Sequence, residues 1–411
     1  MSWPGAGFAA AVTGLGLVTP VGIGVESSWR RVLAGEAAGS HDPLLAGLPV
    51  DFSCRVAGFD PDAALGRSAA WRLDRSAQLA IVALREALQD SGLDQTTWDG
   101  ARVAVVLGNA LGGVQTYELQ QRQLDSAGAR AVSPLLVPMC APNMVAGHLA
   151  MECGAGGPNL VTATACASGT TAIGTARDLL RSGRCDVVIT GGAEAAIGRT
   201  MIAGFARMGA LSRRASEPDA ASRPFDAGRD GFVAAEGAAV LVLERVADAR
   251  ARGARVHGMI SGYGASADAH HATTPDPSGD AVERAVRSAL DDAGLTTADV
   301  DHVNAHGTST KINDATEAKL IQRLFGDRVA VTSTKGVMGH ALGAAGAIEA
   351  VCTVLALREG VVPPTANLET LDPEIELDVV AKAPRLAPHR VAVSNSFGFG
   401  GQNAVLVVTA P

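Results

Sequence analysis

The sequence has no excess of positive charge. Of its 411 residues, 34 are Lys or Arg and 42 are Asp or Glu, so the formal net charge is −8 at pH 7. Nucleic-acid-binding proteins carry a basic surface, and this balance argues against that class. Any basic docking patch must therefore be local. The 47% hydrophobic and 18% charged fractions are typical of a folded globular protein, long enough for two domains or one large double unit.

Cysteines are few, and their spacing excludes two kinds of site. The sequence has no C-x-x-C pair among its six cysteines, which are Cys54, Cys140, Cys153, Cys166, Cys185 and Cys352. Neither a disulfide framework nor a structural zinc site fits this spacing. The usage indicates a reducing compartment, and we expect a cytoplasmic protein.

Long hydrophobic runs are also missing. The N-terminal stretch MSWPGAGFAAAVTGLGLVTPVG is apolar but has no Lys or Arg ahead of its apolar part, so we predict a first strand and a glycine turn rather than a signal peptide. The most apolar later segment, ALGAAGAIEAVCTVLAL, contains Glu349 and is too short to span a bilayer. We predict a buried helix there and no membrane association.

Three pairs of segments occur twice, in the same order. ALQDSGLDQTTWDGARVAVVLGNALGG corresponds to ALDDAGLTTADVDHVNAHGTST, VTATACASGTTAIG to VTSTKGVMGHALGAAGAIEA, and CDVVITGGAEA to RVAVSNSFGFGG. In the first pair a helix ends at glycine (Gly92 and Gly294), and an apolar strand follows. Three ordered pairs indicate an internal duplication.

The repeated pattern also predicts the architecture. Strands that alternate with helices are typical of an α/β protein with mostly parallel strands. Helices rich in Ala and Gly suggest close packing between sheets, so we predict two similar halves in five layers, αβαβα. We assign residues 1–254 to the N-terminal half and residues 255–411 to the C-terminal half.

The duplication brings three chemically active residues toward one place. Cys166 begins a predicted helix, where the helix dipole favours the thiolate; by position alone, an inert buried thiol is an equal alternative. His306 and His340 each adjoin a glycine and follow repeated strands of the second half. Because carboxyl ends of strands form the sites of α/β proteins, we expect the three residues together. One cysteine and two histidines without a carboxylate cluster are a weak set of metal ligands.

Two further features lie near these residues. Lys335 occupies a glycine-rich, apolar turn and needs a carboxylate partner, for which Glu349 is the candidate. The segment NSFGFGGQN has neither a Walker lysine nor the dinucleotide-binding spacing. We interpret it as a loop of backbone donors and a hydrophobic gate.

Five ordered motifs resemble the elongating β-ketoacyl-acyl carrier protein synthases of the II type, which belong to the thiolase superfamily. The motifs are TACASGT around Cys166, ASRPFDAGRDGFVAAEGA, NAHGTST, STKGVMGHALGAAGAIEA and the final GFGG. The resemblance extends over essentially the whole chain, from VTGLGLVTPVG to NSFGFGGQNAVLVV. It implies a thiolase-like αβαβα fold.

The resemblance also implies roles for particular residues. Cys166 looks like the acyl-accepting nucleophile, and His306 and His340 look like the two histidines that stabilise an enolate. Lys335 looks like a further catalytic residue, and Glu349 looks like its supporting partner. Phe399 looks like the phenylalanine that gates the site. The candidates for substrate contacts are Thr308, Thr310 and Thr273 for the pantetheine arm, and Leu111, Ile202 and Phe205 for the acyl pocket. No metal and no cofactor is implied.

The implied reaction is a decarboxylative Claisen condensation. An acyl chain moves from carrier protein to Cys166, with the backbone N–H groups of Cys166 and Phe399 as oxyanion donors. Malonyl-carrier protein then loses carbon dioxide, and the enolate attacks the acyl thioester, which extends a fatty-acid or polyketide chain by two carbons.

The implied partners are acyl- and malonyl-loaded acyl carrier protein, together with a second subunit. That subunit is an identical copy or a sister chain that resembles a chain-length factor. Because carrier protein is acidic, we expect basic residues around the entrance. The candidates are Arg67, Arg72, Arg75, Arg207, Arg213 and Arg214.

Some alternatives within the superfamily fit less well. A degradative thiolase has a second catalytic cysteine near its C-terminus, where this chain has SFGFGG, and a chain-length factor lacks the nucleophile. The sequence departs from the common pattern at Ala234, Ala235, Lys311, Gly336, Met338 and Gln402. These departures suggest a specialised role, in a type II polyketide pathway or as an inhibitor-resistant duplicate. The alternative to an enzyme is a protein without catalytic activity, namely a non-catalytic partner subunit or a decoy on the same fold.

Overall fold

An 11-stranded sheet runs through both halves of the chain. The computed structural model describes residues 7–411, and the strand order is β11-β10-β14-β15-β9-β1-β8-β7-β5-β6, with β2 paired to β1. The strands of the first half are β1 (Ala10–Thr19), β2 (Gly22–Ile23), β5 (Val103–Gly108), β6 (Asn159–Thr162), β7 (Val187–Glu194) and β8 (Gly237–Arg245). Those of the second are β9 (Gly258–Ala267), β10 (His302–Asn304), β11 (Ala330–Thr332), β14 (Val391–Gly398) and β15 (Gln402–Thr409).

The topology confirms the duplication. From the centre outward, the first half runs β1-β8-β7-β5-β6 and the second runs β9-β15-β14-β10-β11. When the five strands of each half are numbered along the chain, leaving out β2, both halves have the same order from the centre outward: first, fifth, fourth, second and third. In each half two pairings are parallel and two are antiparallel, so the expectation of mostly parallel strands is wrong. One of these antiparallel pairings has a local cause, because β14 returns to β15 through a short turn, which only antiparallel neighbours permit.

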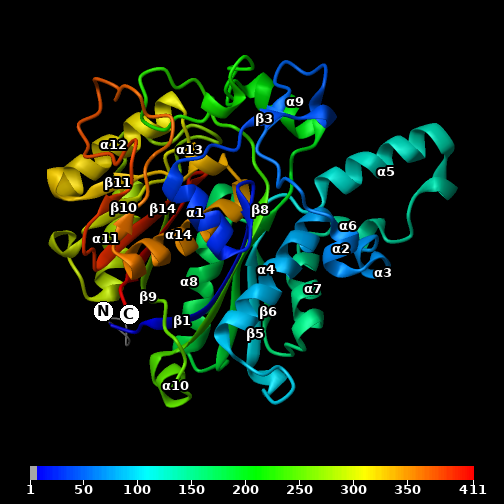
Figure 1. The fold of residues 1–411 in the computed structure, drawn as a ribbon, viewed down its shortest axis with the longest axis horizontal. Helices are drawn as coiled ribbons and strands as arrows, with labels where there is room; N and C mark the ends of the chain where they lie inside the picture. The colour runs from blue at the N-terminus through cyan, green and yellow to red at the C-terminus, as the bar shows by residue number, and fades with distance from the viewer. Residues whose placement is uncertain (1–6) are drawn as a thin grey trace.

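Six principal helices complete the five layers. They are α4 (Arg75–Ser91) and α7 (Met144–Cys153), α8 (Ser168–Arg181) and α14 (Ala345–Glu359), and α11 (Asp280–Ala293) and α12 (Lys311–Phe325). Helices α4 and α7 pack on the first half of the sheet, and α11 packs on the second, with α12 beside it. Helices α8 and α14 contact each other and both halves of the sheet, so they form the middle layer. Figure 1 shows them at the centre of the molecule.

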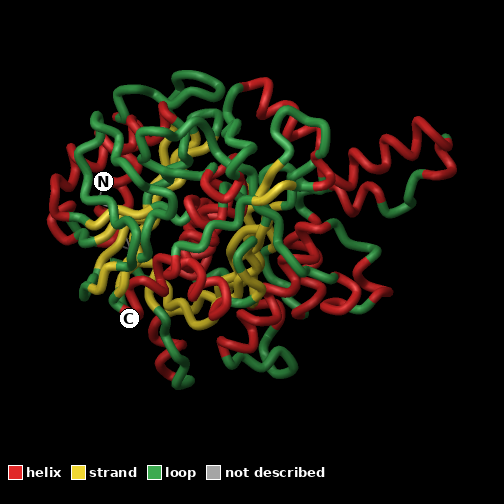
Figure 2. Tube along the Cα trace, turned by 45° about the horizontal axis from the view of Figure 1, so that its top comes forward, coloured by secondary structure: helices red, strands yellow, loops and turns green. Residues whose placement is uncertain are grey.

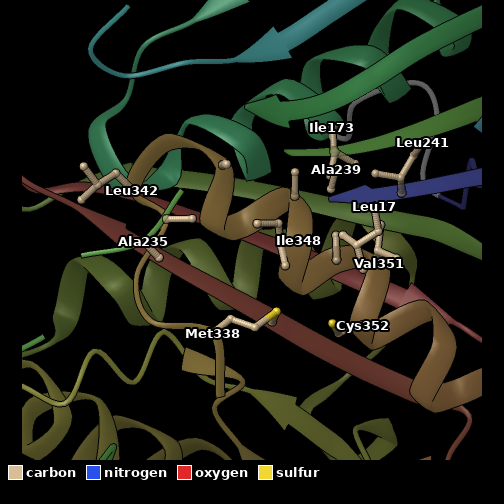
Figure 3. Close-up of a cluster of buried hydrophobic side chains, with 14 of the residues drawn as sticks. Leu17, Ile173, Ala235, Ala239, Leu241, Met338, Leu342, Ile348, Val351 and Cys352 are labelled. Carbon is tan, nitrogen blue, oxygen red and sulfur yellow. The ribbon is translucent and has the colours of Figure 1, made fainter. Parts of the chain in front are cut away.

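Helix α14 confirms the buried helix predicted around Glu349. Every residue from 345 to 357 is buried, because this helix is enclosed by sheet on two sides and by α8 on a third. Figure 3 shows its Ile348 and Val351 among side chains of β1, α8 and β8. The two predicted glycine ends are also confirmed, since Gly92 and Gly294 end α4 and α11 in the left-handed conformation.

The remaining elements lie around this framework. They are α1 (Val25–Ala34), α2 (Pro61–Leu65), α3 (Arg67–Ala70), α5 (Val114–Ala127), α6 (Leu136–Cys140), α9 (Arg199–Met208), α10 (Val246–Ala251) and α13 (Lys335–Met338), with the two-stranded sheets β3 (Ser40–His41) with β4 (Phe52–Ser53) and β12 (Val361–Val362) with β13 (Arg385–Leu386). Helix α5 projects from the body of the molecule (Figures 1 and 2) and has no buried residue. Among the described residues, no helix is both long and apolar enough to cross a membrane. The boundary that we propose at residues 254 and 255 lies between α10 and β9.

Candidate active site

Cys166 lies where the first half meets the second. It occupies the middle of a 3-10 turn, η4 (Ala165–Ala167), between β6 and α8. The preceding Ala165 has a φ of 49°, and this sharp turn directs the thiol into a cavity of about 750 Å³. The same cavity is lined by His306, His340 and Phe399. The convergence predicted from the duplication is therefore present.

The thiol is more enclosed than the sequence suggested. Only 9% of Cys166 is exposed, and burial raises the pKa of its thiol to about 12, although the nearby Lys335 acts in the opposite direction. The expectation of a pKa lowered by the helix start is therefore wrong for this closed site, since the cost of burying a thiolate outweighs the favourable charges around it. A backbone hydrogen bond from Phe399 reaches Cys166 and favours its thiolate.

His306 follows β10 and is held through its backbone. Its N–H donates to Oε1 of Glu317 at 2.8 Å, and the next N–H, of Gly307, donates to Oε2 at 2.8 Å. Burial, Lys335 and His340 lower the pKa of His306 well below its usual range. The ring is therefore neutral near pH 7. It lies 5.4 Å from the ring of His340, nearly perpendicular to it, measured between centroids.

Lys335 and Glu349 form the predicted pair. Both side chains are buried, and the Lys335 ammonium donates to Oε1 of Glu349. The ammonium also donates to the backbone carbonyl of His306 at 2.6 Å and lies 3.4 Å from its Nδ1. A cationic donor against Nδ1 selects the tautomer whose proton is on Nε2. His306 therefore presents a donor on its other ring nitrogen.

His340 is positioned by the strand segment before β8. Its N–H donates to the carbonyl of Val233 at 2.8 Å, and its carbonyl accepts from Ala235 at 3.0 Å. Burial, together with Lys335, lowers the pKa of His340 well below its usual range, so this ring is also neutral. Ala234 and Ala235, two of the unusual residues, thus lie directly behind a histidine of the site.

Most of the predicted substrate contacts lie on the cavity wall. The lining includes Thr308, Thr310, Thr273, Leu111 and Phe205. The prediction that Ile202 lines the acyl pocket is wrong, because Ile202 is buried behind this wall. Its helix neighbours Met201 and Phe205 line the cavity instead. Among the other departures, Lys311 and Gln402 also line it, whereas Met338 is buried in the core cluster.

The basic residues predicted for docking divide into two groups. Arg75 is committed to buried Glu236, with contacts of 2.7 and 2.8 Å, and Arg214 pairs with Glu217 at 3.4 Å. For Arg75 this is a correction, since its charge is neutralised by a buried carboxylate, whereas the pair of Arg214 is solvent-exposed and weak, so Arg214 stays a prediction. Four arginines are exposed and have no ion pair within residues 7–411: Arg67, Arg72, Arg207 and Arg213.

Sequence reasoning missed three residues of the site. Glu317 anchors the loop of His306, and its i,i+11 separation from that histidine gave no signal. Phe232 packs edge-on against the His340 ring, with centroids 5.4 Å apart. Glu194 is fully buried beside the cavity. Its one sequence signal is a carboxyl at the end of an otherwise apolar strand, in ITGGAEA.

The arrangement is suited to covalent transfer of an acyl group. Cys166 provides a nucleophile. The N–H of Phe399 reaches its sulfur, so it lies beside the place where the carbonyl oxygen of an attacked thioester becomes an oxyanion. Two neutral imidazoles face the same cavity and provide donors for a second developing oxyanion. Within the described residues, no group of three His, Cys, Asp or Glu side chains is placed to hold a metal ion.

Comparisons with known proteins agree with this geometry. The family model for the β-ketoacyl synthase N-terminal domain matches residues 9–249, and that for the C-terminal domain matches residues 257–369. The chain is 42% identical over 403 residues to 3-oxoacyl-[acyl-carrier-protein] synthase 2 of Staphylococcus aureus (strain COL), covering 96% of this chain and 97% of that protein.

Solved structures show the same fold. The ishigamide ketosynthase/chain length factor superposes with a TM-score of 0.92 at 34% identity, covering 99% of this chain and 100% of that one. AntDE:AntF, a type II polyketide synthase acyl-carrier protein in complex with its ketosynthase bound to the hexaketide, gives 0.91 at 30% identity, covering 98% and 100%. The chain therefore belongs to the β-ketoacyl synthase family.

Proposed function

We propose that this protein is a 3-oxoacyl-[acyl-carrier-protein] synthase. It takes an acyl chain onto Cys166, decarboxylates malonyl-carrier protein and joins the two by Claisen condensation. The observation that carries the proposal is the shared cavity, in which Cys166 faces two neutral histidines. A non-catalytic subunit needs neither the nucleophile nor a lysine that fixes a histidine tautomer.

Each step of the proposed reaction uses a side chain of this cavity. The Cys166 thiol loses its proton and attacks the acyl thioester, and the thiol of the carrier's pantetheine arm leaves. The histidines then act on malonyl thioester, where loss of carbon dioxide places negative charge on the thioester oxygen. Donors on Nε2 of His306 and on the ring of His340 stabilise this charge. The enolate carbon attacks the acyl-Cys166 thioester, and the thiolate leaves as the new carbon–carbon bond forms.

The test separates the enzyme from a decoy. Acyl-carrier protein should add the mass of one acyl group to the wild-type protein, and the Cys166→Ala variant should add none. Cys140→Ala is the matched control, since Cys140 is the one described cysteine that is not buried and lies outside the cavity. Malonyl-carrier protein should then release carbon dioxide and give a product two carbons longer. A wild-type protein that takes up no acyl group and releases no carbon dioxide contradicts the proposal and supports a decoy.

We further propose that a second subunit covers one side of the molecule. Strand β6 ends the sheet, and its Leu160 is 44% exposed; an unpaired edge strand favours pairing with another chain. On α5, Tyr117 and Leu119 are exposed, as is Val137 on α6. The partner is an identical copy or a chain-length-factor-like sister. Light scattering of the purified chain distinguishes them, because a chain that stays monomeric alone requires the sister.

We also propose acyl carrier protein as the macromolecular substrate and the cytoplasm as the location. Arg207 lies on α9 beside the cavity residue Met208, and the N–H of Arg213 donates to the cavity residue Asp230. Both arginines are exposed and suit an acidic carrier at the entrance. Six free cysteines support a reducing compartment, in which Cys166 stays a thiol.

A further inference from the structure

The duplication relates Cys166 to a glycine in the second half. Gly343 is the middle residue of a 3-10 turn, η8 (Leu342–Ala344), which leads into α14 as η4 leads into α8. The preceding residues share an uncommon backbone conformation, with a φ of 49° for Ala165 and 47° for Leu342. The chain thus builds the same nucleophile turn twice and places a thiol on only one copy.

The residue at the strand end that faces each turn also differs between the two halves. By strand register, Glu194 at the end of β7 corresponds to Gly398 at the end of β14. A Cβ on Gly398 would lie 3.2 Å from the Cys166 nitrogen, and a Cβ on Gly343 would lie 2.6 Å from Oε2 of Glu194. One copy therefore has cysteine facing glycine, and the other has glycine facing glutamate. The Glu194 carboxyl fills the space that mirrors the reacting thiol.

Glu194 connects the two halves at the cavity wall. Its Oε2 accepts from the N–H of Ala110 at 2.8 Å, and the nearby backbone N–H groups of Leu111 and Gly343 lower the pKa of this carboxyl. Ala110 and Leu111 follow β5 in the first half, whereas Gly343 belongs to the second. Ala110, Leu111 and Leu342 all line the cavity that contains Cys166. One buried side chain thus holds apolar wall segments from both halves.

We propose that Glu194 is a positioning residue that sets which acyl chains Cys166 accepts. The inference rests on the proposed acyl transfer. Removing the carboxyl leaves the N–H of Ala110 without its acceptor and takes away the favourable charge beside the N–H groups of Leu111 and Gly343, which costs part of their desolvation. The segments of Leu111 and Leu342 then move to find partners, and the apolar end of the cavity changes shape. Shifts of about 1 Å at such a wall alter reaction rates strongly.

Three variants of Glu194 separate position from charge. Burial raises the pKa of Glu194 to about 8, so the carboxyl is mostly neutral at pH 7 and Glu194→Gln is close to it in size and charge. Glu194→Asp keeps the carboxyl but withdraws it from the N–H of Ala110 and from the nearby N–H groups of Leu111 and Gly343. Glu194→Ala removes it. Glu244→Ala is the matched control, because Glu244 is another buried carboxylate, on β8, bonded to Thr13 and Arg252 and absent from the cavity lining.

The experiment measures single-turnover acyl transfer to Cys166 from short, medium and long acyl-carrier proteins, with malonyl decarboxylation measured separately. We expect Glu194→Ala and Glu194→Asp to change the ratio of long-chain to short-chain rates by about tenfold or more. Glu194→Gln should keep this ratio within about threefold of the wild-type value. Glu244→Ala should lower thermal stability but leave the ratio of long-chain to short-chain rates unchanged.

If Glu194→Asp and Glu194→Ala change the acyl-transfer rate by the same factor for every chain length, the inference is overturned and Glu194 has a structural role only. If Glu194→Ala does not fold, Glu194→Asp decides the outcome. Failure of the proposed function itself is a separate result, because the wild-type protein would then accept no acyl chain.

Discussion

The ammonium of Lys335 touches His306 twice, at the backbone carbonyl at 2.6 Å and near ring Nδ1 at 3.4 Å. One contact fixes the loop and the other fixes the tautomer. Glu349 also pairs with the lysine, and burial raises the pKa of Glu349 to about 7 even though Lys335 lowers it. The lysine therefore acts on the reaction through His306, while it lies outside the cavity lining.

Replacing this lysine should separate the two half-reactions. Lys335→Met removes the donor at Nδ1, so the His306 proton is no longer confined to Nε2, and donation to the enolate oxygen weakens. We expect malonyl-dependent release of carbon dioxide to fall by about 100-fold or more, while acyl transfer to Cys166 falls by less than about tenfold. Lys319→Met, on the exposed side of α12, is the matched control. Equal losses in both half-reactions would contradict the assigned role.

The buried thiol predicts an unusual pH dependence. Because the pKa of Cys166 is raised to about 12, its thiolate fraction should increase about tenfold per pH unit between pH 7 and 9. Iodoacetamide alkylation of the ligand-free protein, followed by mass spectrometry of the Cys166 peptide, measures this directly. The Cys166→Ala variant reports the background from Cys140. A rate that levels off below pH 8 would indicate a thiolate stabilised by the helix start instead.

The contact between the two middle helices tolerates little added volume. A Cβ on Gly346 of α14 would overlap Oγ1 of Thr170 on α8 and approach Oγ of Ser396 to 2.7 Å. We expect Gly346→Ala to lower the free energy of unfolding by about 1–3 kcal/mol, measured by urea denaturation. Gly204→Ala, in α9, meets no atom within 4 Å and should be neutral or stabilising by up to about 1 kcal/mol. Equal effects of the two changes would mean that the crossing is not tight.

The carrier-docking proposal predicts an effect on KM that depends on the carrier. Arg207→Glu should raise the KM for acyl-carrier protein, with a larger effect at low ionic strength than at high. The rate with a small acyl thioester that lacks the carrier should stay unchanged, because Arg207 is absent from the cavity lining. Arg30→Glu, an exposed charge on α1, controls for net charge. A similar loss with both substrates would place the effect in the cavity rather than at docking.

The sequence predicted the parts of the site that repeat and missed those that depend on packing. The duplicated segments place Cys166, His306 and His340 at equivalent strand ends, so their convergence follows from topology alone. The partner of Arg75 is Glu236, a distant residue, and no local pattern announces such a pair. The pKa of Cys166 depends on how tightly both halves enclose it, which composition does not contain. Glu194 was missed because a single carboxyl at a strand end has no meaning until its mirror position is known.

The place of β1 has a consequence for how the chain folds. This strand is the first of the described chain, yet it lies between β8 and β9, pairing along its length with residues 238–245 and through Ala10–Val12 with residues 258–260. Apart from the two-residue β2, its partners are therefore made more than two hundred residues later. Contacts of such separation carry a large loop-closure cost and slow folding. During synthesis most of β1 therefore stays an unpaired apolar segment until β8, at the end of the first half, and β9, at the start of the second, have been made, and this interval is when the protein is most exposed to aggregation.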